Sequence, residues 1–195
     1  MEVERPTEPV LVDWQQIEDR LLSFTYEAVA RFATAHPDET YCFFSYDVDL
    51  PYFLLSFDTP ANAIEVAQRT EQEAIARRAK MLTLPDAWHG ARHFSNRPPV
   101  LDYSYSGGYF AYHAFVDIKI DELEDIGFAE NYPRDDHGDD YAEGNTRIIL
   151  WRVIERLIAS DVFRQLSLAS PFRLGYQMHD DALTVLRILN WPQIE

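Results

Sequence analysis

The chain has 195 residues, of which 47% are hydrophobic and 14% aromatic, and 33 acidic against 17 basic residues give a formal net charge of −16. This composition excludes an intrinsically disordered chain, and the length suits one domain with a sizeable core. The acidic balance disfavours binding to nucleic-acid phosphates and to anionic membranes, so we expect neither partner.

The cysteine content and the apolar runs indicate the compartment. The lone cysteine, Cys42, excludes an intrachain disulfide, which favours a reducing environment, and its apolar neighbours indicate a buried thiol. Residues 1–9 lack the pattern of a signal peptide, and no stretch is long and apolar enough for a transmembrane helix. The sequence therefore predicts a cytoplasmic protein.

The acidic residues are concentrated in one stretch, residues 117–143. Eleven acidic residues lie there with two basic residues, Lys119 and Arg134, so the stretch carries a net charge of −9. Charge of one sign at this density confers solubility and attracts cationic partners. The stretch therefore indicates a basic protein as the partner.

The N-terminal segment predicts an extended lead-in, residues 1–12, followed by a helix. Asp13 and Gln16 form a capping-box-like start, and His36-Pro37 ends the pattern. Apolar residues recur at helical spacing in between, at Ile17, Leu21, Phe24, Ala28 and Phe32.

Two strands and a second helix are predicted next. The aromatic and β-branched runs 41–48 and 52–57 are separated by residues 49–51, Asp-Leu-Pro, which predicts an antiparallel pair joined by a short turn. Thr59-Pro60 is typical of a helix start, since threonine caps the first turn and proline suits its first position. A helix over residues 61–80 is therefore expected, with a more polar composition than the first.

The middle of the chain predicts a loop and a hairpin. Residues 84–99 contain prolines and a glycine among aromatic residues, which is typical of a structured loop. Residues 100–106 and 109–120 flank Gly107-Gly108, and glycine's freedom at positive φ suits a tight hairpin turn. One face of the second arm is expected to carry Phe110, Tyr112, Val116, Ile118 and Ile120.

The acidic stretch predicts little regular structure. Asp121 and Glu124 resemble a capping pair, which predicts a short helix that ends near Gly127. Residues 132–145, YPRDDHGDDYAEGN, then predict an acidic loop.

The C-terminal part predicts helix, strand and helix. Residues 146–160 carry a broad apolar stripe that suits a helix lying on a sheet. Residues 172–178 predict a central strand, and Asp180 is expected to cap a final helix through Leu183, Leu186 and Leu189. This order of elements predicts an α+β fold in a single domain, residues 1–195, with a mainly antiparallel sheet of about four to five strands and helices packed on it.

Three blocks of sequence carry a resemblance. The first is residues 24–67, in which a helix is followed by HPDETYCFFSYDVDLPYFLLSFDTPANAIEVA. The second is the helix TRIILWRVIERLIASDVF, and the third is the ending RLGYQMHDDALTVLRILNWP. Together they resemble a bacterial family of unknown function and of about this length, some members of which lie near immunity genes of polymorphic toxins. The resemblance implies a fold and a binding role but no catalytic residues. It also implies a more helical middle, so hairpin and helix both stay open for residues 100–120.

The acidic loop is the leading candidate for a binding surface. Its carboxylates could face a basic protein, with two tyrosines as aromatic anchors, through Tyr132, Asp135, Asp136, Asp139, Asp140, Tyr141 and Glu143. A calcium site is the weaker interpretation, because neither Gly138 nor Gly144 follows acids at EF-hand spacing. We expect no metal and no cofactor.

A ligand pocket or small active site is the alternative, in residues 88–115. Polar and aromatic groups there could line a pocket: Trp88, His89, His93, Tyr103, Tyr105 and His113. A transition metal could use His89 and His93 with His113 or Asp86, although Gly90 weakens the helical premise.

Other chemistry has less support from the sequence. Ser104, Ser106, His113 and Asp117 hold the groups of a nucleophilic site, but none sits in a nucleophile-elbow pattern. The basic residues between Arg69 and Arg97 alternate with acids, so paired charges on a helix explain them better than a nucleic-acid site.

The sequence thus favours an acidic protein-binding module, in the form of an immunity-type inhibitor that neutralises a cationic toxin by occlusion. A small enzyme or ligand-binding domain is the first alternative, and a scaffold with no specific site is the second. The sequence leaves open the partner's identity and the oligomeric state.

Overall fold

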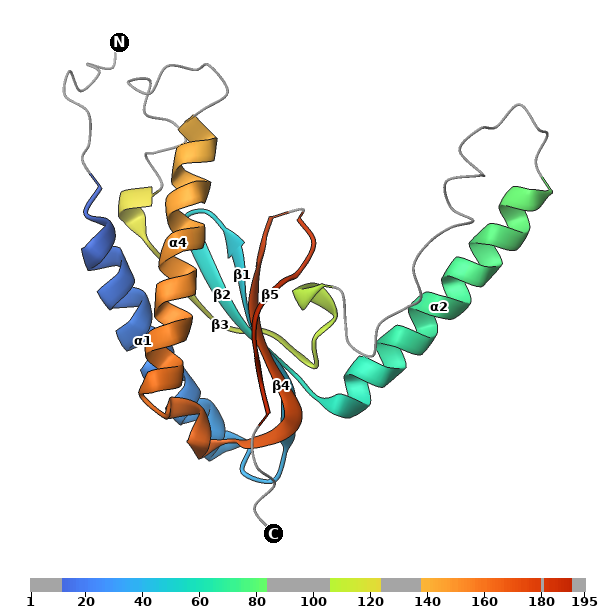
Figure 1. Ribbon diagram of the computed structural model, residues 1–195, viewed down its shortest axis with the longest axis horizontal. Coiled ribbons are helices and arrows are strands. Elements are labelled where there is room, and N and C mark those ends of the chain that lie inside the picture. Colours follow the sequence, from blue (N-terminus) through green and yellow to red (C-terminus); the bar gives the residue numbers. More distant parts are fainter. Residues whose placement is uncertain (1–11, 84–105, 124–137, 180, 191–195) are drawn as a thin grey trace, which may run out of the picture.

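The computed structural model describes residues 12–83, 106–123, 138–179 and 181–190, with the backbone alone at 81–82 and 138–141. Within these residues, three α-helices and a five-stranded sheet form the fold (Figure 1). The predicted lead-in up to residue 11, the predicted loop at 84–99 and the end of the predicted short helix near Gly127 lie outside the described residues.

Helix α1 (Trp14–Ala35) begins and ends as predicted. Asp13 Oδ1 accepts a hydrogen bond from the backbone N–H of Gln16 at 3.1 Å, which satisfies an otherwise free donor of the first turn. At the other end, the N–H of His36 donates to the carbonyl oxygen of Phe32 at 3.0 Å. One side of the helix is buried over its whole length, at Ile17, Glu18, Leu21, Thr25, Ala28, Val29, Phe32 and Ala33.

Strands β1 (Thr40–Asp49) and β2 (Tyr52–Asp58) form the predicted antiparallel hairpin. Asp49 pairs with Tyr52, which leaves Leu50-Pro51 as the turn. Both faces of these strands are buried over most of their length, which explains their nearly continuous apolar sequence.

Strand β4 (Ser167–Met178) runs parallel to β1, and it contains the predicted strand at 172–178. The sheet order is β3-β2-β1-β4-β5, and all its other neighbouring pairs are antiparallel. The predicted α+β class with a mainly antiparallel sheet is therefore confirmed.

The predicted hairpin turn at Gly107-Gly108 is wrong. Residues Gly107–Tyr109 form a turn of 3-10 helix, η1, and neither glycine has a positive φ. Ser106 Oγ accepts a hydrogen bond from the N–H of Gly108 at 3.3 Å, and Gln177 Oε1 accepts one from the N–H of Gly107 at 2.8 Å. The turn is thus attached to β4, and it does not use the positive φ angles that glycine permits.

Strand β3 (Tyr112–Lys119) confirms part of the predicted second arm and excludes a helix there. It pairs antiparallel with β2, whereas the predicted first arm lies outside the described residues except for Ser106. Its alternation is interrupted at Ala114, where φ is 48° and the register with β2 shifts. A bulge of this kind re-aims side chains, and the adjacent Phe115 and Val116 both pack against the helix-side core.

The predicted C-terminal helix is wrong, because residues Thr184–Leu189 form strand β5. It pairs antiparallel with β4, with a register shift between Leu174 and Gly175. A Cβ atom on Gly175 would lie 2.1 Å from the carbonyl oxygen of Thr184, so this close approach requires glycine. The spacing of Leu183, Leu186 and Leu189 suits a helix, but pairing with β4 satisfies the backbone of the segment instead.

Helix α4 (Gly138–Ala159) contains the predicted helix and also the end of the predicted acidic loop. The loop prediction is therefore wrong for residues 138–145. Asp139, Asp140 and Glu143 belong to the first two turns of the helix. Carboxylates are favourable at this end because the helix dipole is positive there.

The two faces of the sheet differ. Helices α1 and α4 pack side by side on one face (Figure 1), where the buried Glu18 of α1 lies 2.9 Å from Arg156 of α4. On the same face, Thr25 shares a 2.6 Å hydrogen bond with the Tyr46 hydroxyl, and burial raises the pKa of Tyr46. The other face carries η1, where Phe110 packs on Phe43.

Helix α2 (Pro60–Leu82) confirms the second predicted helix and projects away from the sheet (Figure 1). Of its described side chains, only Ala63 and Val66 are buried. The helix is therefore attached to the rest of the protein through its first turns.

Candidate binding surface

The structure places the predicted partner-binding residues in two groups. Outside the described residues lie Tyr132, Asp135 and Asp136. In the first two turns of α4 lie Asp139, Asp140, Tyr141 and Glu143, the first three with their backbone alone described. Helical spacing places Asp139 and Glu143 on one face of α4.

Glu143 is bound within the protein. Arg147 Nη2 lies 3.3 Å from Glu143 Oε2 and 2.8 Å from Asp181 Oδ2, which follows β4. The same guanidinium lies 5.9 Å from the ring centre of Tyr176. This arginine offsets two carboxylates, so Glu143 contributes less to a negative surface than the sequence indicates.

The start of the acidic stretch is also partly neutralised. Glu122, in the 3-10 turn η2 (Asp121–Leu123), accepts hydrogen bonds from Arg20 of α1 at 2.6 and 2.8 Å. A backbone hydrogen bond and the Arg20 side chain hold the pKa of Glu122 below its ordinary value. Lys119 lies 3.2 Å from Asp121, whereas Asp117 is exposed. Glu122 and Asp121 are therefore paired with basic residues of the protein itself.

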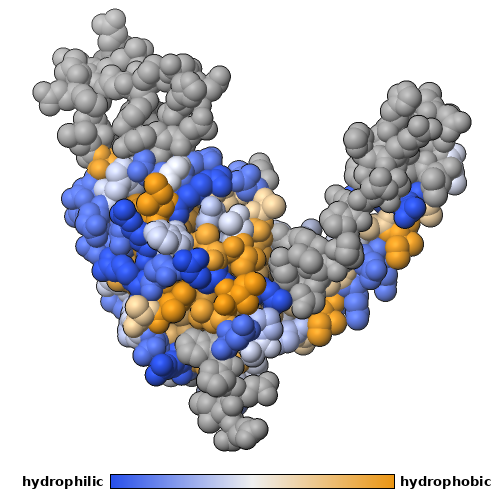
Figure 2. Space-filling model, viewed as in Figure 1, coloured by the Kyte–Doolittle hydropathy of each residue, from blue (hydrophilic) through white to orange (hydrophobic). Residues whose placement is uncertain are grey.

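An apolar surface lies beyond the acidic turns of α4, and we call it the α4–β5 surface. Its exposed apolar members are Ile148 and Trp151 of α4, with exposed fractions of 51 and 44%. Arg187 of β5 lies over the Trp151 ring at 5.9 Å, and its Nε lies 2.5 Å from Glu155 Oε1. Figure 2 shows hydrophobic side chains gathered over β5 and next to α4 on this side of the molecule.

The predicted His/Tyr pocket can be placed only at His113. The other members lie outside the described residues, namely Trp88, His89, His93, Tyr103 and Tyr105. His113 is exposed on β3, and its Nε2 lies 3.2 Å from Oδ2 of Asp47 on β1. The predicted partner of His113 in a nucleophilic site was Asp117, and Asp47 was not predicted. The position of Asp47 in β1 could have indicated it. Side chains alternate along a strand, so Asp47 shares a face with Ser45 and lies on the face opposite to the apolar Phe44 and Val48.

The neighbouring polar groups on this face of the sheet hold the local structure together. Asp58 Oδ1 accepts hydrogen bonds from Thr59 N–H, Asn62 Nδ2 and Ala111 N–H at 3.0, 2.7 and 3.2 Å. Ser56 Oγ accepts the Ala114 N–H at 2.9 Å. These groups position the start of α2 and the bulge of β3.

Comparison with protein-family models, with curated proteins and with solved structures finds no match for the chain. Among the described residues, no group of three or more His, Cys, Asp or Glu side chains could hold a metal ion. The described helices include none that is long and apolar enough to cross a membrane.

Proposed function

We propose that this protein is a binding module for a basic protein, with the α4–β5 surface as the centre of contact and the acidic turns of α4 at its border. The observation that carries the proposal is the exposed Trp151, which lies beside Ile148 and under Arg187. Tryptophan and arginine dominate the energy of many protein interfaces, and clustered exposed apolar groups mark interaction sites.

Electrostatics support the choice of a basic partner. The chain carries a net charge of −16, and Asp139 and Asp140 lie at the end of α4 adjacent to Glu143. Complementary charge speeds encounter, whereas buried aromatic contacts slow dissociation. In its narrower form, the proposal is an immunity-type inhibitor that covers the cationic face of a toxin, for which the support is the sequence resemblance.

The test begins with affinity enrichment from the native host, using the wild-type protein, Trp151→Ala and the matched control Ile64→Ala on α2. We expect to recover a basic protein that elutes as salt is raised. It should bind the wild type and the Ile64→Ala control but not Trp151→Ala. With that protein purified, Trp151→Ala should weaken binding about tenfold or more. Asp139→Asn with Asp140→Asn should slow association and reduce its salt dependence.

Two results would contradict the proposal. One is a partner whose affinity is the same for the wild type and Trp151→Ala. The other is enrichment in which every bound protein is retained equally by all three variants. An inhibitor role requires, in addition, that the purified complex has lost the partner's activity.

A small enzyme or ligand-binding domain is the second proposal, supported by the contact between His113 and Asp47. A carboxylate beside an imidazole orients the ring, which is useful for acid–base chemistry. Amide NMR spectra recorded with a mixture of small polar fragments test this. Shifts confined to His113, Asp47 and Gln177 would support a pocket there, and shifts only at other sites would exclude it.

A further inference from the structure

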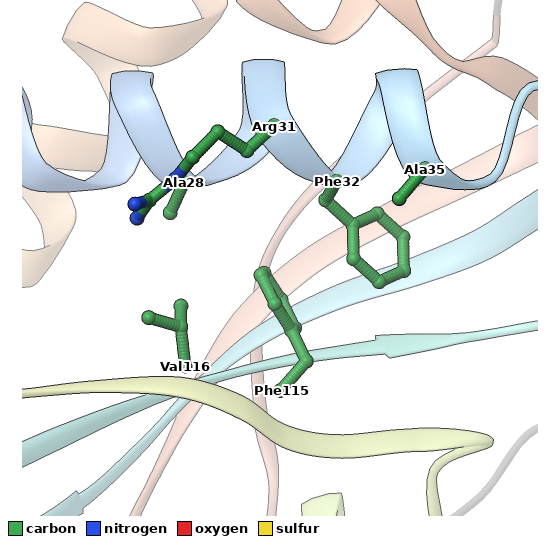
Figure 3. A pocket seen from close by; sticks show the side chains of 6 residues that line it. All are labelled: Ala28, Arg31, Phe32, Ala35, Phe115 and Val116. Atoms are coloured by element: carbon green, nitrogen blue, oxygen red, sulfur yellow. The ribbon is translucent and has the colours of Figure 1, made fainter.

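A groove of about 310 Å³ lies between α1 and the edge strand β3. Its lining is mostly apolar and comes from two elements, with Ala28, Arg31, Phe32 and Ala35 from α1 and Phe115 and Val116 from β3. Figure 3 shows the side chains of Phe115 and Val116 rising from β3 toward the underside of α1. The volume is at the lower end of the range for small binding sites and is large enough for one apolar side chain with neighbouring groups.

The bulge in β3 creates this lining. In a regular strand, successive side chains alternate between the two faces, so Phe115 and Val116 would point in opposite directions. Ala114, with its φ of 48°, interrupts the alternation. Phe115 therefore contacts Phe32, with ring centres 4.5 Å apart, while Val116 stays opposite Leu55 of β2. One wall of the groove thus depends on a backbone feature next to it.

The groove lies where a sixth strand would place its side chains. Among the described strands, β3 pairs with β2 alone, so its outer edge has backbone donors and acceptors available for a further strand. A strand added there would extend the sheet beneath α1. Its helix-facing side chains would then enter the space between α1 and β3. Recognition by strand addition uses this combination of backbone pairing and side-chain pockets.

Arg31 indicates the charge of the added segment. Within the described part of the chain, its side chain forms no hydrogen bond and no ion pair. Glu27 lies one helical turn earlier without an ion pair to it, and Glu39, which follows α1 in the chain, accepts a hydrogen bond from the Tyr112 hydroxyl. That hydrogen bond, with burial, raises the pKa of Tyr112 to about 12, so Tyr112 stays a neutral donor. An uncompensated guanidinium at an apolar groove favours a carboxylate in the ligand.

We propose that β3 and α1 bind an extended segment of a partner protein that adds to the sheet at β3. The segment inserts one apolar side chain into the groove beside the contacting rings of Phe32 and Phe115, and it presents a carboxylate side chain to Arg31. Figure 3 shows Arg31 over Val116, displaced along the groove from the Phe32–Phe115 pair. In a strand, residues two positions apart lie about 6.6 Å from each other and point to the same face. The acid therefore stands two positions from the apolar residue. This groove is at the opposite edge of the sheet from the α4–β5 surface.

The probe is a fluorescein-labelled nonapeptide with a central leucine, a glutamate two positions away on each side, and threonine elsewhere. The symmetric arrangement places an acid near Arg31 whichever way the strand runs. Fluorescence anisotropy with the full chain should show saturable binding. Changing the peptide leucine to threonine should abolish binding, and changing both glutamates to glutamine should weaken it about tenfold.

Two protein variants test the groove itself. Arg31→Gln should weaken the glutamate peptide about tenfold and leave the glutamine peptide unchanged, whereas Arg78→Gln on α2, with the same loss of charge, should change neither. Ala35→Phe fills the groove from the exposed last residue of α1 and should abolish binding. Ala76→Phe on α2 adds the same bulk elsewhere and should bind like the wild type.

Strand addition is tested with two N-methylated peptides. In a strand, successive N–H groups point to opposite edges, so methylating alternate residues blocks one edge at a time. One of the two peptides should lose binding and the other should keep it. Equal binding by both, or equal binding by the wild type and Arg31→Gln, would overturn the proposal. A chain that is dimeric alone and becomes monomeric with Ala35→Phe would overturn it too, since the occupant would then be a second copy.

Discussion

Helices α1 and α2 have nearly the same length, 22 and 23 residues, but very different surroundings. α1 is buried on one side from its first turn to its last, whereas the described buried side chains of α2 are confined to Ala63 and Val66. Both helices are capped at the N-terminus, α1 by Asp13 and α2 by Thr59. Capping and composition thus suffice to start a helix, but the surface opposite it decides whether the helix belongs to the cooperative core.

The start of α2 shows how a projecting helix is attached. Asn62 Nδ2 donates to Asp58 Oδ1 at 2.7 Å and to the carbonyl oxygen of Tyr109 at 2.8 Å. Arg69 lies over the Tyr109 ring at 5.8 Å. Further along, Ile75 is 62% exposed. The outer part of α2 therefore has few contacts that would couple it to global unfolding.

The largest expected difference between the two helices comes from truncating one apolar side chain in each. Phe32→Ala should lower the free energy of unfolding by about 3–5 kcal/mol, because removing the ring would leave a cavity. The Phe32 ring contacts the rings of Phe57 and Phe115, with ring centres 4.8 and 4.5 Å apart. Ile75→Ala should change it by less than about 0.5 kcal/mol. Urea denaturation followed by circular dichroism and tryptophan fluorescence measures both. Similar losses for the two variants would show that α2 is also packed.

A smaller difference is expected from the same backbone change in each helix. Ala30→Gly in α1 should lower the free energy of global unfolding by about 1 kcal/mol, the usual cost of glycine in a helix. Ala76→Gly in α2 should reduce helical circular dichroism and speed amide exchange within α2 without moving the urea midpoint. A shifted midpoint for Ala76→Gly would mean that α2 unfolds together with the sheet.

The smallest effect concerns pH and the attachment of α1. A hydrogen bond from Arg156 of α4, at 2.7 Å, holds the pKa of Asp19 below its ordinary value. Since the folded pKa is the lower one, this contact stabilises the protein at pH values above the unfolded pKa of about 4, and the contribution is lost as pH falls through the folded pKa.

Arg156→Gln should therefore show a smaller loss of stability between pH 6 and about pH 3 than the wild type. Arg78→Gln on α2 is the control, because it changes the net charge equally and cancels the general effect of self-repulsion. Urea unfolding at both pH values provides the measurement. Identical pH dependence for Arg156→Gln and the wild type would exclude a role for this contact.

The elements that the sequence predicted correctly are those whose signals act over a few residues. Asp13, Gln16 and the apolar spacing of α1 are local, and so is the turn at Leu50-Pro51 between two apolar runs. The α+β class followed from the order of these elements. The binding site was less predictable. Of the predicted site residues, only His113 and the four in α4 fall within the described residues, namely Asp139, Asp140, Tyr141 and Glu143. Glu143 is paired with Arg147.

The wrong predictions occurred where a distant partner competes with a local preference. Residues 184–189 have apolar spacing that suits a helix, but β4 offers an edge, and Gly175 lets the strand approach. Gly107 is suited to a hairpin turn, but Gln177 binds its N–H and holds a 3-10 turn against the sheet. The sequence contains both options in each case, and propensity alone does not rank them.

The amino-acid sequence by itself determined where the chain caps, turns and alternates, because those choices depend on side chains within a turn or two of each other. The tertiary structure decided which surfaces meet. It placed β4 parallel to β1, Asp47 next to His113, and the bulged β3 under α1 to form the groove at Arg31. Such contacts join segments far apart in the chain, and their stability comes from burial and pairing that exist only once the sheet has formed.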